Sequence, residues 1–164
     1  MMKGTVLDLL GILLILFIFS VCTILATILM GAFTQNVTDS GQMEGEALAI
    51  LQNTNVYMTS FDSISVFVTF GLILAVILGA FMIDTHPAFF IVTVFLLLIY
   101  MVIVPQFSNV FLAFAENEQV ISTANQFPYM IYMWQHMPLI ILISVVVISI
   151  VIYGKVRGGS QGGY

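Results

Sequence analysis

Long apolar runs separated by short polar segments dominate this chain of 164 residues. A helix needs about 20 mostly apolar residues to cross the roughly 30 Å hydrocarbon layer of a bilayer. Four stretches carry no charged residue at all: 9–38, 63–83, 85–115 and 119–154. The pattern therefore predicts an all-α transmembrane protein, a four-helix polytopic chain forming a single membrane domain. The spans are expected at about residues 9–33, 64–83, 88–104 and 138–153.

The polar segment between the first two runs, residues 34–61, has a helical periodicity of its own. Its least polar positions recur at helical spacing: Met43, Ala47, Ile50, Leu51 and Thr54. Asp39 or Ser40 in front of them can cap a helix. We expect a short interfacial amphipathic helix in this first outer loop, lying on the membrane surface or against a protein partner. A second cap, at Ser60, Asp62 or Ser63, is expected to open the second span.

Prolines indicate the boundaries of the later spans. Asp84-Thr85-His86-Pro87 predicts a tight turn, and both Pro87 and Pro138 suit the first turn of a helix. Pro105 interrupts the third apolar run, so residues 106–115 are expected to continue it as a kinked extension. The polar residues at this kink can line a polar path or satisfy backbone groups and water; the second role is favoured. They are Gln106, Ser108 and Asn109.

Two spans carry small residues at every fourth position. The first span has Thr23, Thr27 and Gly31, and the second has Gly71, Ala75 and Gly79. Helices associate in lipid largely by close van der Waals contact, and small residues let their backbones approach. We expect these six positions to be helix-packing sites, with Ile73 on the opposite face of the second span.

Four aromatic residues cluster just before the last span: Phe127, Tyr129, Tyr132 and Trp134. Amphipathic rings settle at the membrane–water interface. We predict that these residues are interfacial anchors; an aromatic cage around a ligand is the alternative.

The charges are distributed unevenly along the chain. The three basic residues, Lys3, Lys155 and Arg157, lie near the termini, and most of the eight acidic residues lie between the spans. Basic residues collect on the cytoplasmic side of a membrane protein. We therefore expect both termini on the cytoplasmic (or virion-interior) side, with two acidic loops opposite. Residues 154–164 are expected to form a flexible basic tail.

Composition and motifs exclude several classes of function. The chain is 61% hydrophobic and 7% charged, unlike a soluble globule, and its net charge of −5 argues against nucleic-acid binding. It has no metal-ligand spacing, nucleophile motif, nucleotide loop or cysteine pair, and no ionisable residue at mid-membrane. We expect no enzymatic activity, cofactor or metal. A structural membrane protein, an accessory subunit of a cellular membrane complex and a holin-like pore remain as alternatives.

Short motifs in residues 81–143 carry a resemblance to a known group of proteins. They are the Thr85-His86-Pro87 turn before a span, Phe107-Ser108-Asn109 at the kink, and Phe127-Pro128 ahead of the last span. In this layout the region resembles the small multi-span membrane proteins of tailless, membrane-containing bacteriophages. The resemblance implies a component of a virion's internal membrane, with the bilayer, copies of itself and other membrane or capsid proteins as partners. It implies no catalytic residues.

Overall fold

The computed structural model of the chain describes residues 5–41, 45–82 and 87–159. Over these residues the chain is helical, without strands. Its elements are α1 (Thr5–Ser40), α2 (Glu46–Met82), α3 (Pro87–Ala115), a short α4 (Ile121–Ala124) and α5 (Pro128–Gly159). The four long helices each contain a segment long and apolar enough to cross a membrane, which confirms the predicted fold class. These segments are Leu10–Ser40, Glu46–Leu78, Val94–Ala115 and Pro128–Lys155.

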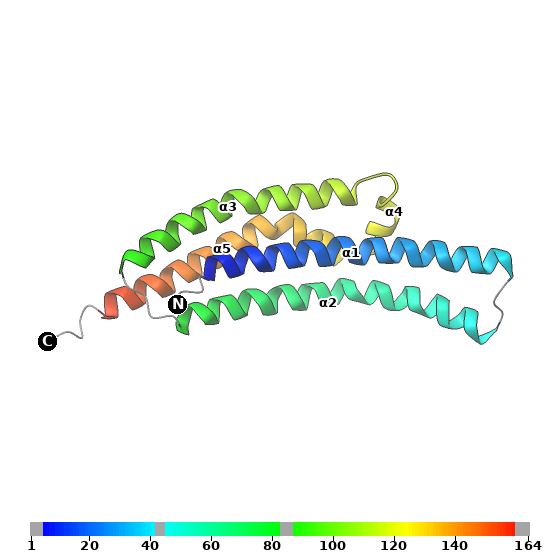
Figure 1. Ribbon diagram of the computed structural model, residues 1–164, viewed down its shortest axis with the longest axis horizontal. Coiled ribbons are helices and arrows are strands. Elements are labelled where there is room, and N and C mark those ends of the chain that lie inside the picture. Colours follow the sequence, from blue (N-terminus) through cyan, green and yellow to red (C-terminus); the bar gives the residue numbers. More distant parts are fainter. Residues whose placement is uncertain (1–4, 42–44, 83–86, 160–164) are drawn as a thin grey trace.

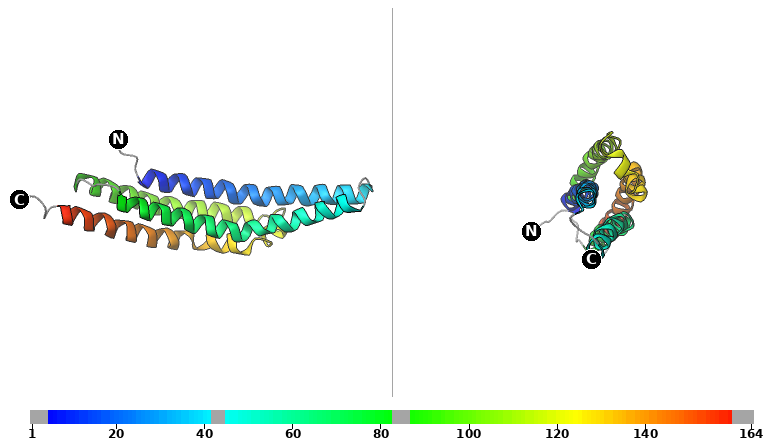
Figure 2. Two further views of the ribbon diagram at one scale, coloured as in Figure 1. Left: turned by 90° about the horizontal axis from the view of Figure 1, so that it is seen from below. Right: turned by 90° about the vertical axis from the view of Figure 1, so that its right-hand side faces the viewer.

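The long helices form an elongated antiparallel bundle (Figure 1). The start of α1 and the end of α5 lie at one end, here called the terminal end, while the α1–α2 connection and α4 lie toward the other, the hairpin end. The main contacts join α1 to α2, α2 to α5, α5 to α3 and α3 to α1. Helix α1 therefore lies diagonally across the bundle from α5, as the end-on view in Figure 2 shows. Both ends of the described chain therefore lie at one end of the bundle, as an even number of crossings requires.

The first outer loop is much shorter than the sequence pattern predicts. Helix α2 begins at Glu46 and continues without interruption into the second span. No proline or glycine occurs between Glu46 and Asp62 to end a helix, so the expected interfacial helix is instead the first part of α2. The separate amphipathic helix is thus corrected to a continuous one.

The turn between α1 and α2 is built on two glycines with left-handed backbone conformation, Gly41 (φ 63°) and Gly45 (φ 65°). The Gly41 N–H donates to the Thr38 carbonyl at 3.3 Å, which closes the last turn of α1. Asp39 and Ser40 accordingly end α1 and do not cap a new helix.

Two prolines lie inside helices. Pro105 lies within α3, which continues to Ala115, so residues 106–115 are the helical extension that the sequence predicts. Pro138 lies within α5, and it is Pro128, ten residues earlier, that occupies the first helical position. The expected start of the fourth span at Pro138 is thus corrected. The aromatic segment before it belongs to the same helix.

The bundle core contains large aromatic side chains from α3 and from the segment around the start of α5. The largest fully buried side chains include Trp134, Tyr100, Phe111 and Phe127. Beyond this region, the tip of the α1–α2 hairpin extends past the ends of α3 and α5 and past α4 (Figure 1).

Candidate functional site

Trp134 connects three helices at the centre of the bundle. Its indole N–H donates to the Ser20 hydroxyl at 2.9 Å, across the diagonal from α5 to α1. The ring stacks on Phe111 of α3, with centroids 5.1 Å apart, and the edge of Phe17 of α1 meets it at 5.8 Å. The side chain has no exposed surface. A large ring with its one donor satisfied contributes both packing and specificity to the core.

A second hydrogen bond compensates for the proline in α5. In an α-helix the carbonyl of residue i accepts from the N–H of residue i+4. Pro138 has no N–H, so the Trp134 carbonyl loses its partner within the helix. The Ser108 hydroxyl of α3 donates to this carbonyl at 2.5 Å. The prediction that Ser108 satisfies a backbone group is confirmed, and the group belongs to the neighbouring helix.

Asp62 caps a helix other than its own. The backbone N–H groups of Tyr129 and Met130 donate to its two carboxylate oxygens, at 3.0 and 2.6 Å. These are the second and third residues of α5, whose N–H groups have no acceptor inside the helix. A side-chain oxygen on the preceding residue usually fills this role, but that residue is Phe127.

The carboxylate from α2 therefore replaces the missing local cap, and its negative charge suits the positive end of the α5 dipole. The side chain is 4% exposed. The expectation that Asp62 opens the second span is corrected, since it lies in the interior of α2.

The four predicted aromatic anchors divide into two pairs. Phe127 and Trp134 are fully buried, whereas Tyr129 and Tyr132 are 60% and 62% exposed. A side chain without exposed surface cannot contact lipid headgroups, so the anchor role does not apply to Phe127 and Trp134. The reason is helical geometry: residues 127, 130, 134 and 137 share the face of α5 that meets the core. An interfacial position for the two tyrosines stays a prediction.

The small-residue stripe of α1 faces the interior of the bundle. Thr23 and Thr27 are buried, and their hydroxyls donate to the carbonyls of Phe19 and Thr23 at 2.8 and 2.9 Å. Each hydroxyl is thereby satisfied by its own helix, so it can be buried at little cost. Gly31 is half-buried, and an added Cβ there would meet no atom within 4 Å.

The corresponding stripe of α2 faces away from the other helices of the chain, so a packing role for it stays a prediction. Gly71 and Ala75 are exposed, and a Cβ at Gly71 would meet no atom within 4 Å. Ile73, which was expected on the opposite, unpacked face, is 7% exposed. The stripe therefore makes no close contact within the chain at these two positions. The side-chain surroundings of Gly79 and the Asp84–His86 turn lie outside the described residues.

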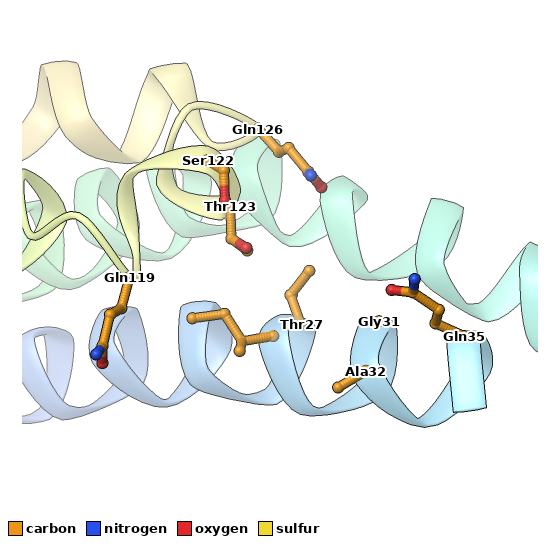
Figure 3. A pocket seen from close by; sticks show the side chains of 9 residues that line it. Thr27, Gly31, Ala32, Gln35, Gln119, Ser122, Thr123 and Gln126 are labelled. Carbon is orange, nitrogen blue, oxygen red and sulfur yellow. The ribbon is translucent and has the colours of Figure 1, made fainter.

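A pocket of about 430 Å³ lies between α1 and the α3–α5 connection. Thr123 reaches into it from α4 and Gln35 from α1 (Figure 3). Its other lining residues are Thr27, Ile28, Gly31, Ala32, Gln119, Ser122 and Gln126. All of its polar groups are uncharged amides and hydroxyls, which suit water or a neutral hydrogen-bonding group. They offer neither a nucleophile activated by a base nor a charged metal ligand.

No family model, curated protein or solved structure matches this chain. Within the described part of the chain, no three His, Cys, Asp or Glu side chains lie close enough to hold a metal ion. The buried polar residues Ser20, Asp62 and Ser108 bond to groups on other helices, so their visible role is to join elements of the bundle.

Proposed function

We propose that this chain is a non-enzymatic structural component of a membrane, namely the internal membrane of a virion. There it packs laterally with copies of itself or with other membrane or capsid proteins. The chain is an integral membrane protein with four spans. The resemblance of residues 81–143 to proteins of membrane-containing bacteriophages supports the viral setting.

The hydrogen bonds that the buried polar groups make to other helices are the observation that best supports a structural role. Polar groups of a transporter or proton relay face a water path or a substrate. Here the Trp134 indole, the Ser108 hydroxyl and the Asp62 carboxylate are each within hydrogen-bond distance of another helix. They are engaged in holding the bundle together.

The filled interior argues against a pore through a single copy. Trp134, Tyr100 and Phe111 are all at most 2% exposed and occupy the space between the helices. A holin-like pore would instead need a polar surface that lines a lumen on assembly.

Fractionation of producing cells tests the proposal. We expect the protein to co-sediment with particles that contain both capsid protein and lipid, and to stay with the lipid after the capsid is removed. Recovery only in cellular membranes would contradict the virion proposal and favour an accessory subunit. Purified protein in vesicles should retain an entrapped dye; rapid dye release would favour the pore.

The orientation is a separate part of the proposal. Because the start of α1 and the end of α5 lie at the same end of the bundle, labels on both termini should be accessible from one side only. We expect that side to be cytoplasmic, or interior in the virion, because the basic residues lie near the termini. A terminal label found on the same side as a label near Gly45 would contradict this orientation.

A further inference from the structure

The pocket between α1 and the α3–α5 connection contains polar side chains that the bundle itself does not use. Within the described residues, five of its lining side chains form no hydrogen bond with another group of the chain: Gln35, Gln119, Ser122, Thr123 and Gln126. Most described Ser and Thr hydroxyls of the long helices instead donate to a backbone carbonyl, as those of Thr23 and Thr27 do. Ser122 and Thr123 have no carbonyl four positions earlier in their own helix, because α4 begins at Ile121. The donors and acceptors of the pocket are therefore available to a ligand.

These groups surround a space that suits a small ligand. The volume of about 430 Å³ lies near the lower end of the range for ligand sites, roughly 300–1,000 Å³. In Figure 3 the amide of Gln119 lies on one side of Thr123, and the amides of Gln35 and Gln126 lie on the other. Ile28 adds aliphatic surface on the α1 wall. A matching ligand has several hydrogen-bonding groups around a partly apolar body.

The charges around the pocket favour a neutral ligand. None of the described residues that line it is charged. The charged residues of the α3–α5 connection, Glu116 and Glu118, are both acidic, so they repel an anion such as phosphate. A divalent cation is usually held by carboxylates, and none lines the pocket.

We propose that this pocket binds a neutral sugar, either free or as the headgroup of a glycolipid. The hydroxyls around a sugar ring both donate and accept hydrogen bonds, and a glutamine amide offers a donor and an acceptor side by side. The C–H groups of the ring suit the aliphatic wall of α1. A bound sugar would contact α1 and the α3–α5 connection together. This binding goes beyond the structural role and does not depend on the virion setting.

The test is protection of a cysteine in the pocket from a maleimide reagent. The full chain carries Ser122→Cys in a Cys22→Ser background, which removes the native thiol. Glucose, galactose and maltose are the probes, and inorganic phosphate is the charged comparison. A sugar at several times its Kd should slow labelling by about fivefold, whereas phosphate should have no effect. Ser60→Cys is the matched control, because Ser60 is exposed on α2 and does not line the pocket; its labelling should not change.

A second pair of variants tests the glutamine amides. Gln126→Met removes an amide and keeps the length of the side chain, so it should weaken sugar binding by about fivefold. Gln106→Met, at an exposed position of α3 outside the pocket, should leave binding unchanged. Thermal unfolding without sugar verifies that both variants fold. Equal weakening by the two would contradict binding in this pocket.

Vesicles distinguish the two sources of sugar. The same labelling is carried out in phosphatidylcholine vesicles with and without digalactosyl diacylglycerol. Protection by this glycolipid alone would assign the site to a lipid headgroup, and protection by the free sugars alone would assign it to a soluble saccharide. Equal labelling rates with every sugar and with the glycolipid, or protection by phosphate, would overturn the proposal. So would protection of the Ser60→Cys control to the same extent.

Discussion

The connections of the two hairpins differ in how they pack: one lies against the bundle and the other lies beyond it. Between α3 and α5, the connection folds back over the bundle and buries Val120, Ala124 and Phe127. Between α1 and α2, the chain turns through two left-handed glycines beyond the rest of the molecule, and side chains such as Ile50 and Tyr57 stay exposed. The sequence pattern predicts both segments as acidic outer loops, and it does not indicate which of them folds back over the bundle.

The difference indicates which contacts contribute most to the stability of this bundle. The α3–α5 hairpin is fixed to α1 and α2 by the Trp134 and Asp62 hydrogen bonds. The outer part of the α1–α2 hairpin, beyond these bonds, lacks comparable cross-links to α3 and α5 in the residues that the structure describes. Substitutions should therefore cost most where hairpins are joined and least at the α1–α2 tip.

Trp134→Ala should have the largest effect. It removes a fully buried ring and its bond to Ser20, so the free energy of unfolding in detergent should fall by about 3–5 kcal/mol. Tyr132→Ala, two residues away on the exposed face, serves as the control and should change it by less than about 1 kcal/mol. Similar losses for the two variants would show that Trp134 does not join the hairpins.

Asp62→Ala should cost about 1–3 kcal/mol, because the buried N–H of Met130 and the partly buried N–H of Tyr129 lose their acceptors. Asp62→Asn keeps one acceptor oxygen and should cost less. Hydrogen exchange at the Tyr129 and Met130 amides provides a local readout and should accelerate in both variants. Unchanged exchange in Asp62→Ala would contradict capping across helices; Asp39→Ala, at an exposed site, is the control.

The two small-residue stripes allow a buried and an exposed position of the α1–α2 hairpin to be compared. Thr27→Leu adds volume at a buried position and should destabilise the protein by about 1–3 kcal/mol. Gly71→Leu projects into open space and should change the free energy of unfolding by less than about 1 kcal/mol. Unfolding in a denaturing detergent series measures both, and an equal loss for the two would place Gly71 in a contact between copies.

The smallest effects are expected at glycines of the α1–α2 hairpin, and they should differ in sign. Gly41→Ala places a Cβ on a left-handed residue and should cost about 1–2 kcal/mol. Gly31→Ala lies inside α1, where the added Cβ meets no atom within 4 Å, and should stabilise the protein by up to about 1 kcal/mol. Thermal unfolding of the two variants in one detergent makes the comparison; a stabilising Gly41→Ala would contradict the turn geometry.

Local pattern was sufficient for the fold class but not for the fate of individual side chains. The apolar runs predicted four spanning helices because each run exceeds the length that a bilayer requires. In the stripe of α1, Thr23 and Thr27 are buried, whereas Gly71 and Ala75 of the stripe in α2 are exposed. Their identical spacing identifies residues that share a face but not the face that meets a neighbour.

The sequence by itself determined the helices, the four crossings and the near-absence of charge within them, since these follow from the free energy of placing each residue in lipid or water. Only the tertiary structure decided that Asp62 caps α5, that Ser108 replaces the donor missing at Pro138, and that Trp134 lies in the core. Each of these contacts joins residues at least 26 positions apart, and no local preference encodes which helix will supply the partner. The extension of the α1–α2 hairpin past α3 and α5 belongs to the same class because it is set by packing between helices and not by the composition of any one of them.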